Sequence, residues 1–543
     1  PCSRTEADVN ADQAISHLAP AAGAATPPID RLHLLEAVQT NLRDLIDDVG
    51  AADAAMKNGL IGADLVSETE SAAAAAMPIG FQIAAMMDLY DGLTNGQMPE
   101  PESIEPVGDD LWDITVRRLS RRDRLVYSDQ TAVLRVKGQP EQVNPMDNPA
   151  GIIAVLGAGN YTSALEMVNA LFLENCAVVH KPHHNNVDSD RVWARIFAPL
   201  VEAKAMAFVE EDPDRRLNTD PRIAKLYFTG STSTAERIMA STDIPLVSEC
   251  GGNNPVIVVP GDRPWTDDEI EHQAEMIVSV GKLNGGAVCG RGQTLVTSRH
   301  WPQRDAFLDA VRRAAIETVP SGTYYPGSDE VKAGFLDAYP EAERLQPTGS
   351  DHARTELLLI TGADEDSYAT ANEAFCQILG EVPLDVAASA DQFLPAAVAF
   401  ANEHLLGTLG CAILIDEDTE AANETALAQA VSDLDYGGIA VNEMPPTIWL
   451  NPLLTWGGNG EGPDGHRPFV SGVGNFGNLY NYRNVEKSIL TSTFLSAAHM
   501  RFVDPEVSAH QLNGLARLAV DPSWTSLARL MGRTVIDSIT HRS

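Results

Sequence analysis

The chain has 543 residues, enough for two or three domains that each bury a core of their own. Hydrophobic residues make up 44% and charged residues 21%, as in ordinary globular proteins, and no run of eighteen apolar residues predicts a membrane span. The 76 acidic residues outnumber the 38 basic ones and give a formal net charge of −38. We therefore expect neither nucleic acid nor an anionic membrane as a partner.

The N-terminal quarter is predicted to be an arm followed by helices. Residues 1–30 are rich in Ala, Pro, Asp and Thr and predict a flexible arm. Residues 31–124 carry apolar residues at helical spacing, as in IDRLHLLEAVQTNLRDLIDDV. The alternating stretch RLVYSDQTAVLRVKGQP, at residues 124–140, then predicts a pair of strands in the segment 125–148.

From residue 149 the pattern changes to strand, glycine turn, helix and strand. GIIAVLGAGN, a helical stretch and AVVHKP follow one another within residues 149–261, and a second alternating region spans 262–445. Alternating strands and helices are typical of parallel α/β sheets. Residues 491–543, which include TSLARLMGRTVIDSI, predict a helical tail.

The stretch GIIAVLGAGNYTS partly matches a dinucleotide-binding fingerprint. Gly157 and Gly159 follow a strand, as they would where a pyrophosphate meets the N-terminus of a helix, but Thr162 stands where the third glycine is expected. Alone, this segment is a weak signal for an ordinary Rossmann motif.

Six cysteines are spread along the chain without a CxxC pair or zinc-ligand spacing. We expect reduced thiols, a cytoplasmic location and no metal site. They are Cys2, Cys176, Cys250, Cys289, Cys376 and Cys411.

One cysteine lies in an unusual setting, the stretch NGGAVCGRGQ at residues 284–293. A structural cysteine usually has apolar neighbours, whereas glycines let another group approach the main chain closely. Cys289 is therefore a candidate nucleophile for a carbonyl carbon, with an inert loop cysteine as the alternative reading.

Several motifs resemble, in chain order, those of the aldehyde dehydrogenase superfamily. GNYTSALEMVNALFLENCAVVHKP resembles the stretch from its catalytic asparagine to its cofactor-binding lysine, and YFTGSTSTAERIM resembles its FTGS turn. VSECGGNNPVIV is similar to the segment with its general base, and NGGAVCGRGQ to its nucleophile loop. NEAFCQIL is similar to its cofactor clamp and WGGNGEGP to its PFGG segment. The resemblance covers about residues 125–490 and indicates a remote branch.

The resemblance implies an α/β fold with two parallel, Rossmann-like domains and an oligomerisation β-hairpin. Residues 149–261 would form the NAD(P)-binding domain and 262–445 the catalytic domain, with 446–490 returning to the cofactor domain. The hairpin would come from residues 125–148 and pair with NVEKSIL near 484–490. A homodimer or homotetramer is the implied assembly.

The resemblance also implies catalytic roles. Cys289 matches the nucleophile, and Asn160 matches the side chain that, with the Cys289 main-chain N–H, holds the oxyanion. Glu249 matches the general base that activates water. The plainer readings are a turn or helix cap for Asn160 and a solvated loop residue for Glu249.

Six residues match cofactor-binding positions of the family, with surface or core packing as the plainer reading of each. The lysine of the HKP segment and the residue three positions after it would contact the adenosine ribose of the cofactor or its 2′-phosphate. The FTGS turn would face the pyrophosphate, and the clamp segment NEAFCQIL would hold the nicotinamide ribose. These residues are Lys181, His184, Gly230, Ser231, Glu373 and Phe375. NAD-preferring members have a glutamate where His184 stands, so we expect NADP to be accepted at least as well as NAD.

The expected function is NAD(P)-dependent oxidation of an aldehyde to a carboxylic acid through a cysteine thiohemiacetal and thioester. A CoA-acylating aldehyde dehydrogenase or acyl-CoA reductase is one alternative, and a catalytically silent scaffold that binds a protein partner is another. Arg291 either pairs with a substrate carboxylate or a coenzyme phosphate, or binds a neighbouring loop.

Overall fold

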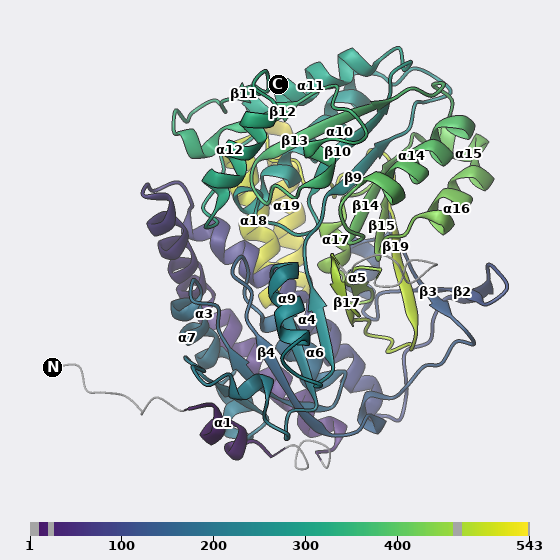
Figure 1. Cartoon of the computed structure of the whole chain (residues 1–543). Coiled ribbons are helices and arrows are strands. Elements are labelled where there is room, and N and C mark those ends of the chain that lie inside the picture. Colours follow the sequence, from purple (N-terminus) through teal and green to yellow (C-terminus); the bar gives the residue numbers. More distant parts are fainter. Residues whose placement is uncertain (1–9, 20–25, 460–469, 541–543) are drawn as a thin grey trace.

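Two mixed β-sheets organise the chain, each with parallel strands at its centre and antiparallel strands at an edge (Figure 1). The computed structural model describes residues 10–19, 26–459 and 470–540. Within these ranges the predicted α/β architecture is confirmed. Part of the motif WGGNGEGP, from residue 460 onward, lies outside the described residues.

The smaller sheet has six strands and lies among the helices of the N-terminal half. Its central strands, such as β4, are buried on both faces, which explains why they are continuous apolar runs in the sequence. In spatial order the strands are β17 (Gly472–Val473), β8 (Leu246–Glu249), β7 (Lys225–Thr229), β4 (Gly151–Leu156), β5 (Cys176–Lys181) and β6 (Met206–Phe208). β17, which lies within the segment 446–490 predicted to return to the cofactor domain, pairs with β8 of this sheet.

The larger sheet has eleven strands. Seven neighbouring strands, from β19 to β12, run parallel, and antiparallel strands complete both ends. The order is β1 (Ser103–Pro106), β2 (Leu111–Val116), β3 (Thr131–Lys137), β19 (Val485–Thr491), β15 (Gly438–Val441), β14 (Gly410–Leu414), β9 (Asn254–Val258), β10 (Gly292–Ser298), β13 (Ile378–Leu384), β12 (Leu357–Ile360) and β11 (Glu343–Leu345). A separate pair joins β16 (Thr455–Trp456) and β18 (Phe476–Gly477).

The boundary between the two sheets falls earlier than the predicted residue 261. Strand β9, which was expected in the cofactor domain, pairs with β10 and β14 of the larger sheet. The chain crosses between the sheets at Gly251 and Gly252, directly after β8. A Cβ atom on Gly251 would lie 1.8 Å from the Glu373 carboxylate, so this crossing requires a residue without a side chain.

The predicted pairing of the two distant edge segments is confirmed, because β3 and β19 form an antiparallel ladder. The predicted strand pair within 125–148 is wrong in one half, since its first residues end helix α5 (Arg121–Val126), whose cap Ser120 accepts from the Asp123 N–H. The other strands of this group are β1 and β2, so residues 103–116 are not helical as predicted. β19 also pairs with β15 of the same chain.

Two long helices, α3 (Pro28–Ile61) and α4 (Glu68–Thr94), cover one face of the smaller sheet, and α1 (Ala11–His17) packs on the other. Residues 11–17 therefore form a packed helix where a flexible arm was predicted, because Ala11, Ala14 and Ile15 are buried against the sheet. α4 is long and apolar enough to cross a membrane, but 61% of its apolar window is buried inside the protein.

The remaining helices connect strands or cover the sheets. Their N-termini often follow capping residues, as at Thr266, whose side chain accepts from Glu269 N in a capping box. They are α6 (Ala164–Phe172), α7 (Val187–Ile196), α8 (Ala198–Glu202), α9 (Thr232–Met239), α10 (Asp267–Lys282), α11 (Arg304–Glu317), α12 (Ser328–Ala338), α13 (Tyr368–Ala371), α14 (Ala390–His404), α15 (Glu417–Ala422), α16 (Glu424–Asp433) and α17 (Pro446–Trp449).

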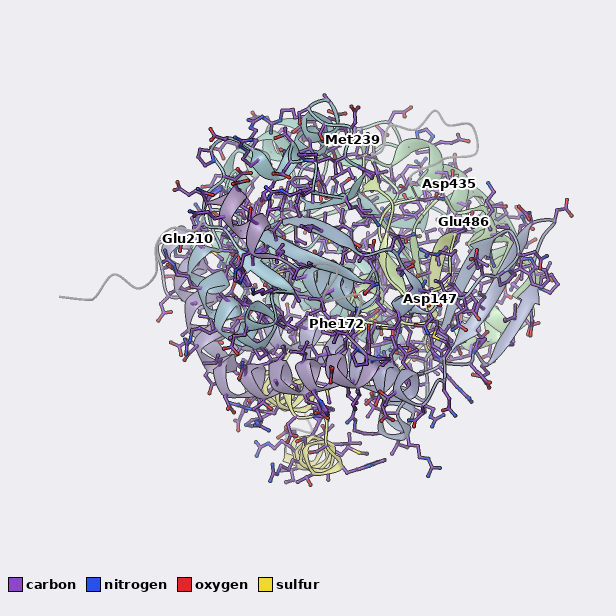
Figure 2. All side chains as sticks on the ribbon, turned by 90° about the horizontal axis from the view of Figure 1, so that it is seen from below. Asp147, Phe172, Glu210, Met239, Asp435 and Glu486 are labelled. Carbon is purple, nitrogen blue, oxygen red and sulfur yellow. The ribbon has the colours of Figure 1, made fainter. Side chains whose placement is uncertain are left out.

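The C-terminal segment folds back onto the N-terminal helices. The predicted helical tail is confirmed as α18 (Pro505–Val520) and α19 (Trp524–Thr540), and α18 packs along α4 (Figure 1). The contact is close, because a Cβ atom on Gly80 would lie 2.7 Å from the Ala519 carbonyl oxygen. Seen from below, Phe172 lies in the middle of the packed interior, while Glu210 and Met239 lie at the rim (Figure 2).

Candidate active site

The loop before Cys289 has a backbone that only a few residue types adopt. Asn284, Gly285 and Gly286 have φ values of 53°, 65° and 83°, three left-handed residues in succession. A Cβ atom on Gly285 would lie 2.2 Å from the Gly322 carbonyl oxygen, and one on Gly286 would lie 2.4 Å from the Cys376 carbonyl carbon. The NGG sequence thus permits the turn that presents Cys289.

A buried asparagine at the start of β9 fixes both sides of this nucleophile loop. The Asn254 amide donates to the main-chain carbonyls of Cys289 at 2.6 Å and Arg291 at 2.9 Å. Its oxygen accepts from Gly410 N at 3.0 Å. Asn254 lies in the motif VSECGGNNPVIV, but its partners are far away in sequence, so this positioning role was not predicted.

Glu249 ends strand β8 and lies beside Cys289 in the interior. Its side chain is buried, and its Oε1 accepts from the Trp456 indole N–H at 3.2 Å. Burial raises the pKa of Glu249 to about 7, against hydrogen bonds from Cys289 and Trp456 that favour the carboxylate. The structure therefore brings the predicted nucleophile and the predicted base together, with Trp456 as a partner that the sequence did not indicate.

The Cys289 thiol is half-buried and faces acidic groups. Burial, the hydrogen-bonded Glu249 carboxylate and the more distant Glu373 raise the pKa of this thiol well above its usual value. In the absence of bound molecules Cys289 is thus protonated, and Glu249 is the group within reach that can accept its proton.

Asn160 lies on the other side of the nucleophile loop. Its amide nitrogen donates to the Ala287 carbonyl at 3.1 Å, which leaves the second N–H of the amide for another acceptor. Its own main-chain carbonyl accepts from the Tyr324 hydroxyl at 3.0 Å and from the Asn284 amide at 3.2 Å. Asn160 is thus held rigidly near Cys289, as an oxyanion donor requires.

A further carboxylate, Glu166 on α6, lines the same pocket and was not predicted. It is buried, and Thr229 Oγ1 donates to its Oε1 at 3.3 Å. Burial raises the pKa of Glu166 to about 7, and its charge contributes to the raised pKa of Glu249. A glutamate within an apolar helical run is the signal in the sequence, since α6 is otherwise buried and almost wholly apolar.

The residues predicted for the adenosine end lie at the carboxyl edge of the smaller sheet. Lys181 ends β5, and its amine contacts only the Pro182 carbonyl at 3.4 Å. His184 is exposed, and its ring centroid lies 4.0 Å from that of His183. Ser231 caps α9, and Gly230 N donates to the Glu249 carbonyl at 3.1 Å, so this turn also positions the base.

Glu373 and Phe375 occupy the predicted clamp position next to the crossing between the sheets. The Glu373 carboxylate lies against Gly251, and burial raises its pKa to about 7, against a hydrogen bond from the Gly252 main chain. Phe375 has a left-handed backbone with φ of 48°, and its ring meets Tyr325 edge-on at 4.8 Å between centroids. Glu373 is thus close enough to Cys289 and Glu249 to influence both of their pKa values.

Arg291 points away from the pocket. It is buried and donates to the Ile378 carbonyl at 2.9 Å and to Gln293 Oε1 at 3.4 Å. Of the two predicted roles, the structure places it in the second, as a side chain that binds a neighbouring segment.

The residues around α9 and β5 have the donor set of a nicotinamide dinucleotide site. In the described residues, the main-chain N–H groups of Ser231, Thr232 and Ser233 at the start of α9 donate to no protein acceptor, as an anion-binding helix end requires. Among the described residues the Lys181 amine has only the Pro182 carbonyl as a partner, so it can meet a phosphate or ribose, and Glu373 offers a carboxylate for a ribose hydroxyl. These residues therefore fit NAD or NADP.

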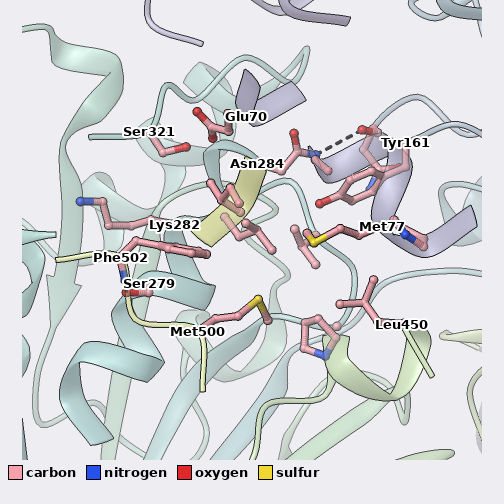
Figure 3. A pocket seen from close by; sticks show the side chains of 18 of the residues that line it. Glu70, Met77, Tyr161, Ser279, Lys282, Asn284, Ser321, Leu450, Met500 and Phe502 are labelled. Atoms are coloured by element: carbon pink, nitrogen blue, oxygen red, sulfur yellow. Dashed lines mark hydrogen bonds between the residues drawn. The ribbon is translucent and has the colours of Figure 1, made fainter. Parts of the chain in front are cut away.

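A cavity of about 220 Å³ opens above Cys289. Asn160, Glu249 and Glu166 lie at its polar floor together with the nucleophile. Tyr161, Met77, Leu450, Met500 and Phe502 project into it from several elements (Figure 3). The candidate site thus places the predicted nucleophile beside the predicted base in the lining of a largely apolar pocket.

Comparisons with known proteins agree with this geometry. The sequence model of the aldehyde dehydrogenase family matches residues 127–379. An aldehyde dehydrogenase from Pseudomonas syringae, solved with NAD+ and octanal, is 15% identical, with a TM-score of 0.60 over 90% of each chain. NADP-dependent glyceraldehyde-3-phosphate dehydrogenase from Bacillus halodurans, solved with NADP, is 15% identical, with a TM-score of 0.59 over 89% of this chain and 90% of that one.

Lactaldehyde dehydrogenase from Escherichia coli is 17% identical, with a TM-score of 0.59 over 88% of this chain and 91% of that one. These likenesses establish the fold, and the motifs around Cys289 and Glu249 lie inside the residues that the family model matches. Residues 127–379 thus match the aldehyde dehydrogenase family model, and the chain has the fold of the aldehyde dehydrogenases.

Proposed function

We propose that this protein oxidises an aldehyde to a carboxylic acid with NADP or NAD. The observation that carries the proposal is the contact between the Cys289 thiol and the Glu249 carboxylate at the floor of a pocket that also presents the Asn160 amide. A nucleophile, a base and an oxyanion donor in mutual reach are the components of acyl chemistry at a carbonyl carbon.

The first step follows from the proton affinities of the floor residues. Glu249 accepts the Cys289 proton as the sulfur attacks the aldehyde carbon, which forms a thiohemiacetal. The negative charge that develops on the former carbonyl oxygen is met by the free N–H of the Asn160 amide and by the Cys289 main-chain N–H. Asn254 keeps the nucleophile loop in place during this step.

Lys181, the start of α9 and Glu373 would hold NADP or NAD, which would supply the hydride acceptor needed for oxidation of the thiohemiacetal to a thioester. After it releases the Cys289 proton to solvent, Glu249 removes a proton from the water that hydrolyses the thioester, and a pKa of about 7 suits a base working near neutrality. Trp456 orients the carboxylate through its indole N–H. Since His184 stands where a carboxylate would repel a 2′-phosphate, we propose that NADP is accepted at least as well as NAD.

The proposal is tested by mixing the purified protein with NADP or NAD and a panel of aldehydes, and following reduced nicotinamide by its absorbance. The expected result is formation of reduced cofactor and carboxylic acid in equal amounts without coenzyme A. If reduction of the cofactor requires coenzyme A, the acyl group is transferred to a thiol and the proposed hydrolysis is wrong. No reduction with any aldehyde would favour the silent scaffold.

Assembly and location are proposals as well. The five described cysteines are free, which suits a reducing cytoplasm. A homodimer or homotetramer would have to use surfaces other than the two edges of β19, because β3 and β15 of the same chain already pair with them.

A further inference from the structure

Much of the apolar lining of the pocket comes from parts of the chain outside the residues that the family model matches. Met500, Phe502 and Leu512 come from the C-terminal segment, and Met77 comes from α4 (Figure 3). With Trp449 and Leu450 of α17, they present thioether, aromatic and aliphatic groups to the cavity. We call Met500–Leu512 the tail wall.

Hydrogen bonds and an ion pair within the protein hold the tail wall in place. Phe502 N donates to Ser279 Oγ at 2.9 Å, and its carbonyl accepts from Val319 N at 2.7 Å. Arg501 pairs with Glu275 at 3.1 Å. One residue before Met500, His499 Nδ1 lies 2.8 Å from His272 Nε2 of α10. A wall held at several points favours a preformed binding surface over a loosely closing one.

The two lysine amines that line the cavity already have partners within the protein. Lys282 Nζ donates to Thr318 Oγ1 at 2.9 Å and to the Thr318 carbonyl at 3.1 Å, and Lys57 Nζ lies 2.6 Å from Asp53 Oδ2. No arginine is among the described residues that line the cavity, whereas Glu70, Glu166 and Glu249 are. A substrate with its own carboxylate would meet these acidic groups, and it would have to displace the hydrogen bonds of Lys282 or the ion pair of Lys57 to reach a cation.

The size of the cavity limits the apolar part of the substrate. A dry apolar cavity of about 150 Å³ holds benzene. Scaled from that reference, a cavity of about 220 Å³ accommodates roughly eight or nine carbon atoms.

We propose that the substrate is an uncharged, apolar aldehyde of about eight carbon atoms, such as octanal or phenylacetaldehyde, and that the tail wall selects it. This inference rests on the proposed function, because it takes Cys289 as the atom that receives the aldehyde. The apolar chain lies against Met500, Phe502 and Met77 while the carbonyl reaches the polar floor.

The test compares kcat/KM for acetaldehyde, butanal, octanal, phenylacetaldehyde and succinic semialdehyde. Each methylene group buried on binding is worth about fourfold, so octanal should exceed butanal by at least roughly 30-fold. Succinic semialdehyde should be poorer than butanal. Equal values for butanal and octanal, or a preference for succinic semialdehyde, would overturn the inference.

Variants locate the selectivity in the tail wall. Met500→Asp should lower kcat/KM for octanal at least roughly tenfold while acetaldehyde changes less than about threefold, since one buried apolar contact becomes a charge. Met500→Leu should retain the preference for octanal. Met531→Asp is the matched control, because Met531 of α19 is 56% exposed. Circular dichroism verifies folding, and an unchanged octanal preference in folded Met500→Asp would refute the role of the tail wall.

A binding measurement separates this inference from the proposed function. Trp449 and Trp456 line the cavity, so 1-octanol should alter tryptophan fluorescence of the wild-type protein and succinate should not. Octanol binding without oxidation of any aldehyde would contradict the proposed function and leave the apolar specificity intact. Aldehyde oxidation without octanol binding would refute the specificity alone.

Discussion

The polar floor and the apolar wall of the pocket depend on different properties of the side chains that form them. At the floor, Cys289, Glu249 and Glu166 are ionisable groups whose pKa values are raised by burial, and their properties depend on the position of each neighbour. At the wall, Met500 and Phe502 offer apolar area, which depends on size and shape alone. The comparison teaches that reaction and selection are separable here, and that substitutions in the two regions should have different signatures.

The largest effect is expected at the floor, from Cys289→Ala. Removal of the nucleophile should lower aldehyde oxidation by at least about 10³-fold with every substrate, because no covalent intermediate can form. Thermal unfolding should change little, since a small half-buried side chain is lost. Cys176→Ser, remote from the pocket in β5, is the control. Comparable turnover in Cys289→Ala would show that another group is the nucleophile.

Glu249→Gln tests the base and should lower steady turnover by roughly 10²–10⁴. Because Glu249 also accepts the Cys289 proton in the first step, the burst of reduced cofactor in rapid-mixing absorbance should become slower as well. Wild-type turnover should rise with pH through about 7, because the raised pKa keeps Glu249 protonated and unable to act as a base below that pH. The variant should lack this rise. Normal turnover of the variant with coenzyme A would instead support acyl transfer to a thiol.

A substitution at the proposed cofactor site should have a more moderate effect on activity. His184→Glu places a carboxylate near Lys181, where it would repel a 2′-phosphate, so the ratio of kcat/KM for NADP to that for NAD should fall by about tenfold. His33→Glu, an exposed change on α3, is the control for added negative charge. A strong wild-type preference for NAD that His184→Glu leaves unchanged would refute the assignment.

Glu166 tests how much a buried carboxyl group at the pocket floor reduces the stability of the fold. Its folded pKa is raised to about 7 from a usual value of 4.5, so it stabilises the fold when protonated, and this contribution is lost as pH rises from about 4.5 through 7. Glu166→Gln should therefore raise the unfolding temperature at pH 8 by a few degrees and leave it almost unchanged at pH 4.5. An equal shift at both pH values would show that ionisation of Glu166 does not matter.

The smallest effect is expected behind the wall, at the pair His272 and His499. Burial lowers their pKa values to about 3 and about 4, below the usual 6.5, so the unfolded chain binds more protons. Their contribution to stability is present above pH 6.5 and is lost as pH falls to 4 and below. Arg501, near both rings, and Asp129, near His499, also act on this pair. His272→Gln should make thermal stability less dependent on pH between 6.5 and 4, unlike the exposed His33→Gln.

The predictable part of the molecule consists of local patterns. The strands of the two sheets, the β3 to β19 pairing, the helical tail and the turn around Cys289 follow from hydrophobic periodicity, glycine placement and the order of short motifs. Glu249 could be proposed as a base because it stands directly before a glycine pair in such a motif. The helix at residues 11–17 and the strands at 103–116 were mistaken, because short elements leave little periodic signal.

Other features were decided by tertiary structure alone. Trp456 reaches Glu249 across 207 positions of sequence, and Met500 shares a pocket with Met77 only because α18 packs on α4. The raised pKa values of Glu166, Glu249 and Glu373 also arise from burial that no single segment encodes. The sequence by itself thus determined which residues we propose as reactive, and the local backbone that presents them. The pKa values of these residues and the position of the tail wall depend on segments that are far apart in the sequence. These segments exclude water from the pocket only when the chain is folded.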